Sequence, residues 1–170
     1  MKNFFLLFLC QTFILFQSFE ASKIKWKTYQ NDYFSIDYPK KWIVLEARAM
    51  TSFFPGPRKI GKVEENFSVF RDSLMPHSTI ETYSKYLYDR ALEIEEFNVL
   101  ESKMIKTNHE KYYLLTYEGR YGAVANVRFM EKVIVVKNIG YRQVFVSKKK
   151  NFTAYLFKVN HMMETFRVIE

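Results

Sequence analysis

The chain has 170 residues with only five glycines and four prolines, and 18% of its residues are aromatic. This composition excludes a disordered chain, and the length suits one domain with a substantial core. The formal net charge is +8, which favours contact with anionic membrane surfaces, cell-wall polymers or acidic proteins, although a high lysine content also serves solubility alone.

The first 22 residues have the order of parts of a secretory signal peptide. Lys2 precedes a dense run of Phe, Leu and Ile, and the segment ends on the small residues Ala21 and Ser22. Polar residues interrupt the run, which is shorter than a membrane-spanning helix requires. We therefore predict a signal peptide over residues 1–22, cleaved after Ala21 or Ser22, and a protein exported to the periplasm or the cell exterior.

The only cysteine, Cys10, lies inside this segment. Cleavage would leave a mature domain, residues 23–170, with no disulfide and no thiolate for catalysis or metal binding. Lipid attachment at Cys10 is the alternative, but leucine stands where a lipid-attachment motif has glycine or alanine, and the apolar run continues past the cysteine. The mature domain is thus expected to be stabilised by packing alone.

The mature chain begins with strand patterns. Residues 26–30 and 33–38 are two aromatic-rich runs around an Asn-Asp pair, which predicts an opening β-hairpin. Pro39 ends the second run because it has no N–H to donate to a neighbouring strand. Trp42 is predicted to fill the core beneath this turn, and residues 43–45 resume extended structure.

Residues 51–65, TSFFPGPRKIGKVEE, are predicted to form a long loop because prolines, glycines and basic residues interrupt any strand or helix period. Its two phenylalanines would supply apolar contact area while its cations steer an acidic partner or an anionic surface. The alternative is an ordinary connection whose phenylalanines pack back onto the core. The predicted partner-binding residues are Phe53, Phe54, Arg58, Lys59 and Lys62.

Further along the chain, strands alternate with two amphipathic helices. Ser78 or Thr79 is expected to cap a helix whose apolar residues recur at helical spacing from Ile80 to Ile94. A last helix is predicted from Phe152 to Phe166 on the same grounds. The remaining strands are predicted at residues 67–71, 99–106, 112–118, 128–137 and 141–146.

This order of elements predicts the fold class. Residues 133–136 are apolar on both faces and suit a central strand under two layers. Consecutive short strands imply an antiparallel sheet, on which the two helices bury their apolar stripes. We predict an α+β fold in which an antiparallel β-sheet is flanked by helices, an α/β/α sandwich.

Two stretches carry a resemblance to a known group of proteins. The opening FSIDYPKKW and the closing MMETFRVI, with the order of elements between them, resemble the PsbP-like superfamily over residues 26–168. That group includes the PsbP proteins of photosystem II, bacterial DcrB-like exported proteins and a nuclear import factor that binds the GTPase Ran. The resemblance implies an antiparallel sheet with helices on both faces and a role in binding or in assembling larger complexes. It transfers no catalytic residue.

Catalytic and metal-binding patterns are scarce. The sequence has no G-x-S-x-G elbow, phosphate loop or dinucleotide fingerprint. His77 and His109 lie in predicted turns. His161 and Glu164, three apart on the last helix, could share a metal, but zinc takes three or four protein ligands. We therefore expect neither an enzyme nor a metal or other cofactor.

The leading hypothesis is an exported, non-catalytic domain that binds a protein or an anionic envelope component, with the assembly of a larger complex as one such role. Contact with nucleic acid is not expected, and membrane contact only at the surface. The run Lys148, Lys149 and Lys150 is a second candidate basic surface. The alternatives are a small-molecule carrier with a tyrosine-lined pocket and an unrecognised hydrolase. The tyrosines considered for that pocket are Tyr83, Tyr86, Tyr88, Tyr112, Tyr113, Tyr117 and Tyr121.

Overall fold

A computed structural model describes residues 24–57, 65–122 and 124–169. The predicted signal peptide lies outside these residues. No helix in the described ranges is long and apolar enough to cross a membrane.

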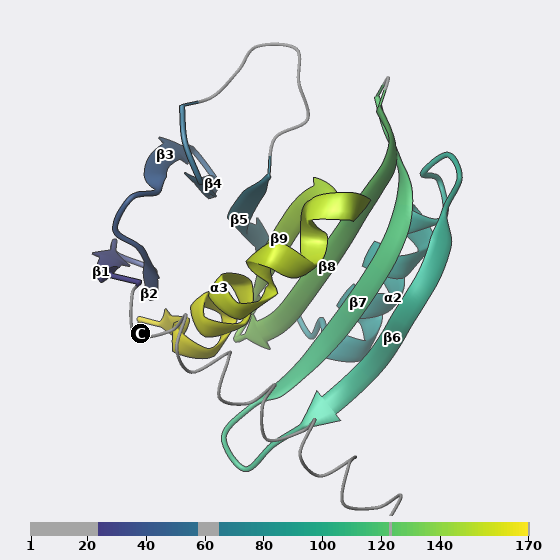
Figure 1. Cartoon of the computed structure of the whole chain (residues 1–170). Coiled ribbons are helices and arrows are strands. Elements are labelled where there is room, and N and C mark those ends of the chain that lie inside the picture. Colours follow the sequence, from purple (N-terminus) through teal and green to yellow (C-terminus); the bar gives the residue numbers. More distant parts are fainter. Residues whose placement is uncertain (1–23, 58–64, 123, 170) are drawn as a thin grey trace, which may run out of the picture.

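The described residues form two antiparallel sheets and two α-helices (Figure 1). The small sheet has the order β1-β2-β10 and the large sheet the order β3-β4-β5-β9-β8-β7-β6. The strands of the small sheet are β1 (Trp26–Gln30), β2 (Phe34–Pro39) and β10 (Arg167–Val168). Those of the large sheet are β3 (Ile43–Ala47), β4 (Met50–Phe54), β5 (Asn66–Ser73), β6 (Asn98–Lys106), β7 (Lys111–Tyr121), β8 (Val124–Val136) and β9 (Ile139–Lys148). The helices are α2 (Ile80–Ala91) and α3 (Phe152–Thr165), the latter preceded by the 3₁₀ turn η1 (Lys149–Asn151).

The opening hairpin forms as predicted. The side-chain oxygen of Asn31 accepts hydrogen bonds from the backbone N–H groups of Tyr33 and Phe34, at 2.9 and 3.0 Å. This local bond fixes the turn between β1 and β2. β10 then pairs with the other edge of β2, so the end of the chain returns to its opening strands.

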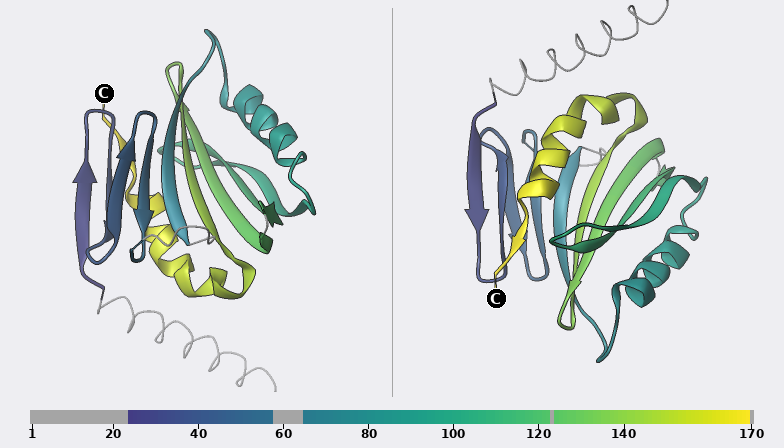
Figure 2. Two further views of the ribbon diagram at one scale, coloured as in Figure 1. Left: turned by 90° about the horizontal axis from the view of Figure 1, so that it is seen from above. Right: turned by 90° about the horizontal axis from the view of Figure 1, so that it is seen from below.

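The helices cover opposite faces of the large sheet (Figure 2). α3 packs with the small sheet on one face, in a core that includes Phe67, Phe145 and Met162. α2 packs on the other face against Leu115 and Val133. Because alternate residues of a strand point to opposite faces, the central strands β8 and β9 contribute to both cores. This confirms the α+β sandwich.

The start of α2 agrees with the sequence, but its end does not. Thr79 caps the helix in a capping box with Thr82, as expected. The apolar stripe predicted a helix as far as Ile94, whereas α2 ends at Ala91 and tighter turns follow. Ile94 still packs against the same core, because Gly119 leaves it room: a Cβ atom at Gly119 would lie 2.6 Å from the Ile94 Cγ2 atom.

The prediction of a loop over residues 51–65 is wrong at its start. Residues 51–54 belong to β4, which pairs with β3 on one side and β5 on the other. Ser52 lies opposite Ser68, and Phe53 opposite Phe67. Pairing on both sides outweighs the nearby prolines and glycines, which begin only after the strand has ended.

Trp42 is buried, as predicted, with 7% of its surface exposed. Its backbone N–H donates to the Pro39 carbonyl at 2.8 Å, which closes the turn after β2. Its ring meets that of Tyr155 on α3 edge-on, with centroids 6.1 Å apart. The tryptophan therefore joins the opening hairpin to the last helix.

Replacing Trp42 with alanine should destabilise the fold by about 3–5 kcal/mol, because a large aromatic side chain leaves a cavity at this junction. Urea denaturation measures the loss. Ile43→Ala is the matched control, since Ile43 is the next residue and is 40% exposed; it should cost roughly 0.5 kcal/mol. Equal losses for the two variants would contradict the assignment of Trp42 to the core.

Candidate functional site

One face of the large sheet is only partly covered by its helix. α2 contacts β7 and β8, and beside it lies a cavity of about 490 Å³, which we call the sheet cavity. Its apolar lining residues are Met50, Phe54, Phe70, Ile94, Phe129, Val144 and Val146. Its polar lining residues are Ser52, Asn66, Ser68, Arg90, Tyr117, Tyr121, Glu131 and Arg142. The cavity therefore combines apolar walls with a small set of polar groups, which is typical of ligand sites.

The polar centre of the sheet cavity is formed by Tyr117, Glu131 and Arg142. They lie on β7, β8 and β9, and each neighbour of Glu131 is placed diagonally across a strand pair, within reach of long side chains. The Tyr117 hydroxyl donates to Glu131 Oε1 at 2.7 Å. Arg142 Nη1 lies 3.5 Å from Glu131 Oε2. Both carboxylate oxygens thus face a donor from a neighbouring strand.

Aromatic rings hold these side chains in position. The Tyr117 ring stacks on Phe129, with centroids 4.7 Å apart. The guanidinium of Arg142 lies over the Phe70 ring, 4.5 Å from its centroid. Stacking of this kind restricts a guanidinium and adds a favourable electrostatic contact. The groups are therefore pre-positioned.

The electrostatics of the cavity favour hydrogen-bond donors. Burial, together with the neighbouring Glu131 charge, raises the pKa of Tyr117 far above its ordinary value, so its hydroxyl stays protonated and donates. Glu131 is 4% exposed. The Arg142 Nε atom is buried and has no hydrogen-bond partner among the described residues.

Two serines form the floor of the cavity on β4 and β5. Ser52 and Ser68 lie opposite each other, and their hydroxyl oxygens are 2.7 Å apart. Both are buried. Because serine side chains are small, they do not fill the space above β4 and β5, and the cavity remains open.

The loop predicted to bind a partner is only partly described by the structure. Phe53 is fully buried, where it packs against Tyr29, Tyr38 and Phe67. The expectation that it supplies contact area at the surface is therefore corrected, because its side chain points into the core on the α3 face of β4. Phe54 points to the other face and lines the sheet cavity. Arg58, Lys59 and Lys62 lie outside the described residues.

The second predicted basic surface is partly neutralised. Lys149 Nζ donates to Glu118 Oε2 at 2.9 Å, and Arg128 donates to the other oxygen of Glu118, from Nε at 2.9 Å. Lys148 is half-buried and Lys150 is exposed. The three lysines border a shallow hollow, and the middle one is committed to an ion pair.

A second concave surface lies on the α3 side of the molecule, which we call the lysine groove. It has a volume of about 830 Å³. Its residues come from the start of the chain's described part, the β2–β3 turn, the end of β4 and α3: Ile24, Lys25, Pro39, Lys40, Lys41, Trp42, Pro55, Tyr155 and Lys158. No sequence pattern predicted this groove, although Lys40 and Lys41 follow Pro39 directly in FSIDYPKKW.

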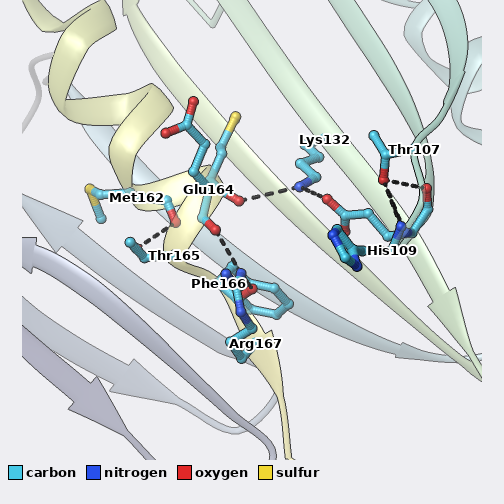
Figure 3. Close-up of polar contacts among 10 residues, drawn as sticks. Thr107, His109, Lys132, Met162, Glu164, Thr165, Phe166 and Arg167 are labelled. Atoms are coloured by element: carbon cyan, nitrogen blue, oxygen red, sulfur yellow. Dashed lines mark hydrogen bonds and ion pairs between the residues drawn. The ribbon is translucent and has the colours of Figure 1, made fainter.

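A third polar cluster closes the C-terminal end of α3 (Figure 3). Lys132, which is 8% exposed, donates to the Met163 carbonyl at 3.3 Å and to Glu110 Oε1 at 2.6 Å. Arg167 donates to the Glu164 carbonyl at 2.6 Å. Cations at this end of a helix satisfy its last carbonyl groups and complement its dipole. The cluster is explained by helix capping.

His161, which was considered for a metal site with Glu164, contacts Trp26 and Asp37. The His161 ring lies 3.9 Å from the Trp26 ring, centroid to centroid, and its Nε2 atom is 3.9 Å from Asp37 Oδ2. In the turn after β6, Thr107 accepts a hydrogen bond from the backbone N–H of His109 at 3.2 Å. Within the described ranges, no group of three or more His, Cys, Asp or Glu side chains is placed to hold a metal.

Comparisons with known proteins bear on the fold. No protein-family model matches the chain, and no curated protein sequence matches it. The solution structure of cyanobacterial PsbP (CyanoP) from Synechocystis sp. PCC 6803 is similar, with a TM-score of 0.62 at 14% identity over 86% of this chain and 94% of that one. PA94 from Pseudomonas aeruginosa, a protein of unknown function described as a putative regulator, has a TM-score of 0.59 at 13% identity over 82% and 94%. The chain therefore has a PsbP-like fold, as its sequence predicted.

Glu118 should make the stability depend on pH. Hydrogen bonds from Lys149 and Arg128 lower its pKa in the folded protein, so its contribution is present above the unfolded pKa of about 4.3 and is lost as the pH falls through the folded value. Glu118→Gln should lower the free energy of unfolding at pH 7 by roughly 1–2 kcal/mol. Urea denaturation at pH 7, 5 and 3.5 should show that the difference in the free energy of unfolding between the original protein and the variant becomes smaller as the pH falls. A difference that is constant with pH would contradict the assignment.

Proposed function

We propose that this chain is an exported, non-catalytic PsbP/DcrB-like domain that binds an acidic segment of an envelope protein in the lysine groove. Three features support the proposal: the signal-peptide pattern of residues 1–22, the PsbP-like fold and the charge of the groove. The charge of the groove is the observation on which the proposal mainly rests.

Four lysines line the groove, and no acidic side chain is among its described lining residues. Lys25, Lys40 and Lys41 are exposed, and none of the four forms an ion pair with a described carboxylate. Several lysines outside the groove are paired, for example Lys85 with Asp89 at 2.6 Å, and those without an ion pair, such as Lys106 and Lys137, do not line the groove. The concentration of unpaired positive charge in one concave surface attracts an acidic partner and raises its association rate.

The floor of the groove is apolar and offers a partner the half-buried ring of Tyr155, next to the buried Trp42 and Pro39. Trp42, Tyr155 and Pro39 lie beneath the lysines. Aromatic side chains at the centre of an interface carry much of the binding energy, with charges at its rim. A concave surface accepts a polypeptide segment, whereas a flat bilayer would meet the lysine tips without reaching the floor. The prolines keep the groove rigid, which lowers the ordering cost of association.

A binding role also fits the sheet cavity. Glu131 is the one carboxylate among the described lining residues, and both its oxygens face protein donors. Tyr117 stays protonated because its pKa is raised, so it is not a nucleophile near neutral pH. This arrangement disfavours the hydrolase alternative.

The carrier alternative is favoured by a specific observation, the sheet cavity itself. Of the seven tyrosines considered for a ligand pocket, Tyr117 and Tyr121 line it. The cavity is on the face of the sheet opposite the lysine groove, so the two roles do not exclude each other.

The test of the lysine groove replaces Lys40, Lys41 and Lys158 with serine. A fluorescent peptide of alternating Glu and Leu residues is titrated with the purified protein at low and moderate salt. We expect the triple variant to bind at least about tenfold more weakly at low salt, because each lysine lost weakens the attraction, and its salt dependence to be smaller.

The matched control replaces Lys106, Lys137 and Lys150, which are exposed and lie away from the groove. It should leave the affinity nearly unchanged. Equal losses in the two triple variants would mean that the peptide responds to net charge alone and would contradict the proposal. If the protein bound phosphatidylglycerol vesicles and did not bind the peptide, the partner would be a lipid surface, and the proposal of a protein partner would be contradicted.

A further inference from the structure

We infer that the sheet cavity binds a single-chain amphiphile with an anionic head group, the head at Arg142 and the chain along the apolar walls. This is a second binding site, on the other face of the sheet from the lysine groove, and it does not depend on the function proposed for that groove.

The cavity has the size and lining of a small-molecule site. Its volume of about 490 Å³ falls within the usual range for ligand pockets. Apolar side chains reach it from both sides: Phe70 and Val144 from the sheet, and Ile94 from the segment that follows α2. These walls continue to the rim, where Tyr121 is 58% exposed. An alkyl chain lying along them would remove apolar surface from water.

The hydrogen-bonding groups at the centre of the cavity indicate which kind of head group would bind there. Glu131 is satisfied, since Tyr117 donates to one of its oxygens and Arg142 faces the other. Arg142 has five N–H donors, yet its single ion pair is loose, at 3.5 Å, and its Nε atom has no partner among the described residues. Arg142 therefore has a free hydrogen-bond donor at the centre of the cavity, which an acceptor on a ligand would satisfy.

The charges lead to the same conclusion. The lining residues include two arginines, Arg90 and Arg142, against one glutamate, Glu131, so the cavity carries one excess positive charge. Arg90 is exposed at the end of α2, whereas Arg142 stacks on the Phe70 ring at the centre of the cavity. A carboxylate or phosphate head accepts two parallel hydrogen bonds from a guanidinium, which neither a neutral alcohol nor a quaternary ammonium does.

Substitutions at Arg142 and Glu131 distinguish a role in ligand binding from a purely structural role of their ion pair. Decanoate binding is measured by isothermal titration calorimetry below its micelle concentration. Arg142→Gln removes the head-group donor and should weaken binding about tenfold or more. Glu131→Gln removes the competing carboxylate and should leave binding equal or tighter. Each variant breaks the same ion pair, so a purely structural role would weaken decanoate binding in both.

Ligand controls identify the head group. Decyltrimethylammonium and decanol should bind at least about tenfold more weakly than decanoate, because neither offers a charged acceptor. Monodecyl phosphate distinguishes the two anionic heads: tighter binding than decanoate assigns a phosphate, and weaker binding a carboxylate. Equal affinity for all four amphiphiles would overturn the inference, since apolar burial alone would then explain binding.

Two further variants keep the inference testable if Arg142→Gln does not fold. Arg90→Gln changes an exposed rim residue and should weaken decanoate binding about threefold, as expected for a rim charge. Arg48→Gln, an exposed arginine outside the cavity lining, should have no effect. Equal effects of the two would overturn the inference. Binding of the acidic peptide to the lysine groove should be unchanged throughout, so failure at one site is distinguishable from failure at the other.

Discussion

The structure depends on the need to bury both faces of β8 and β9, over which the described part of the chain places α2 on one side and α3 with the small sheet on the other. These strands stand at the centre of the large sheet, between β5 on one side and β7 on the other. α3 and the small sheet bury one face, and α2 buries part of the other. A single helix does not span a seven-stranded face, so β4, β5 and β9 are left beside α2. The sheet cavity is the direct consequence.

The α3 face of the large sheet is closed by the two ends of the described chain. β10 pairs with β2, and Lys132 caps the last turn of α3 from within the sheet. Trp42 packs between the β2–β3 turn and Tyr155. The lysine groove lies over this junction, so its floor is part of the core. Its rigidity is therefore supplied by the same packing that stabilises the fold.

Local signals predicted much of this fold. An Asn side chain fixed the opening turn, and Thr79 marked the start of α2. Residues 51–54 were missed because a strand of four or five residues before a Pro-Gly-Pro run has too short a period to recognise, and only its pairing with β3 and β5 stabilises it. The end of α2 was missed because Ile94 keeps helical spacing in non-helical turns.

The sheet cavity could not be predicted, because its central residues lie on three strands and meet only through the pairing register. One signal was available: Glu131 stands between Phe129 and Val133 on the same face of a strand. An acidic residue at such an inward position needs a partner, and that partner is supplied by β7 and β9. The lysine groove likewise joins residues far apart in the sequence, Lys41 and Lys158 among them.

In the proposed function, two independent binding sites lie on opposite sides of the large sheet. Amide and side-chain NMR titration of the labelled protein tests it most directly, with the acidic peptide and decanoate added separately and then together. We expect the peptide to perturb residues around Trp42 and Tyr155, decanoate to perturb residues around Glu131 and Arg142, and both ligands to bind at once. Competition between the two ligands, or perturbation of one shared set of residues, would contradict it.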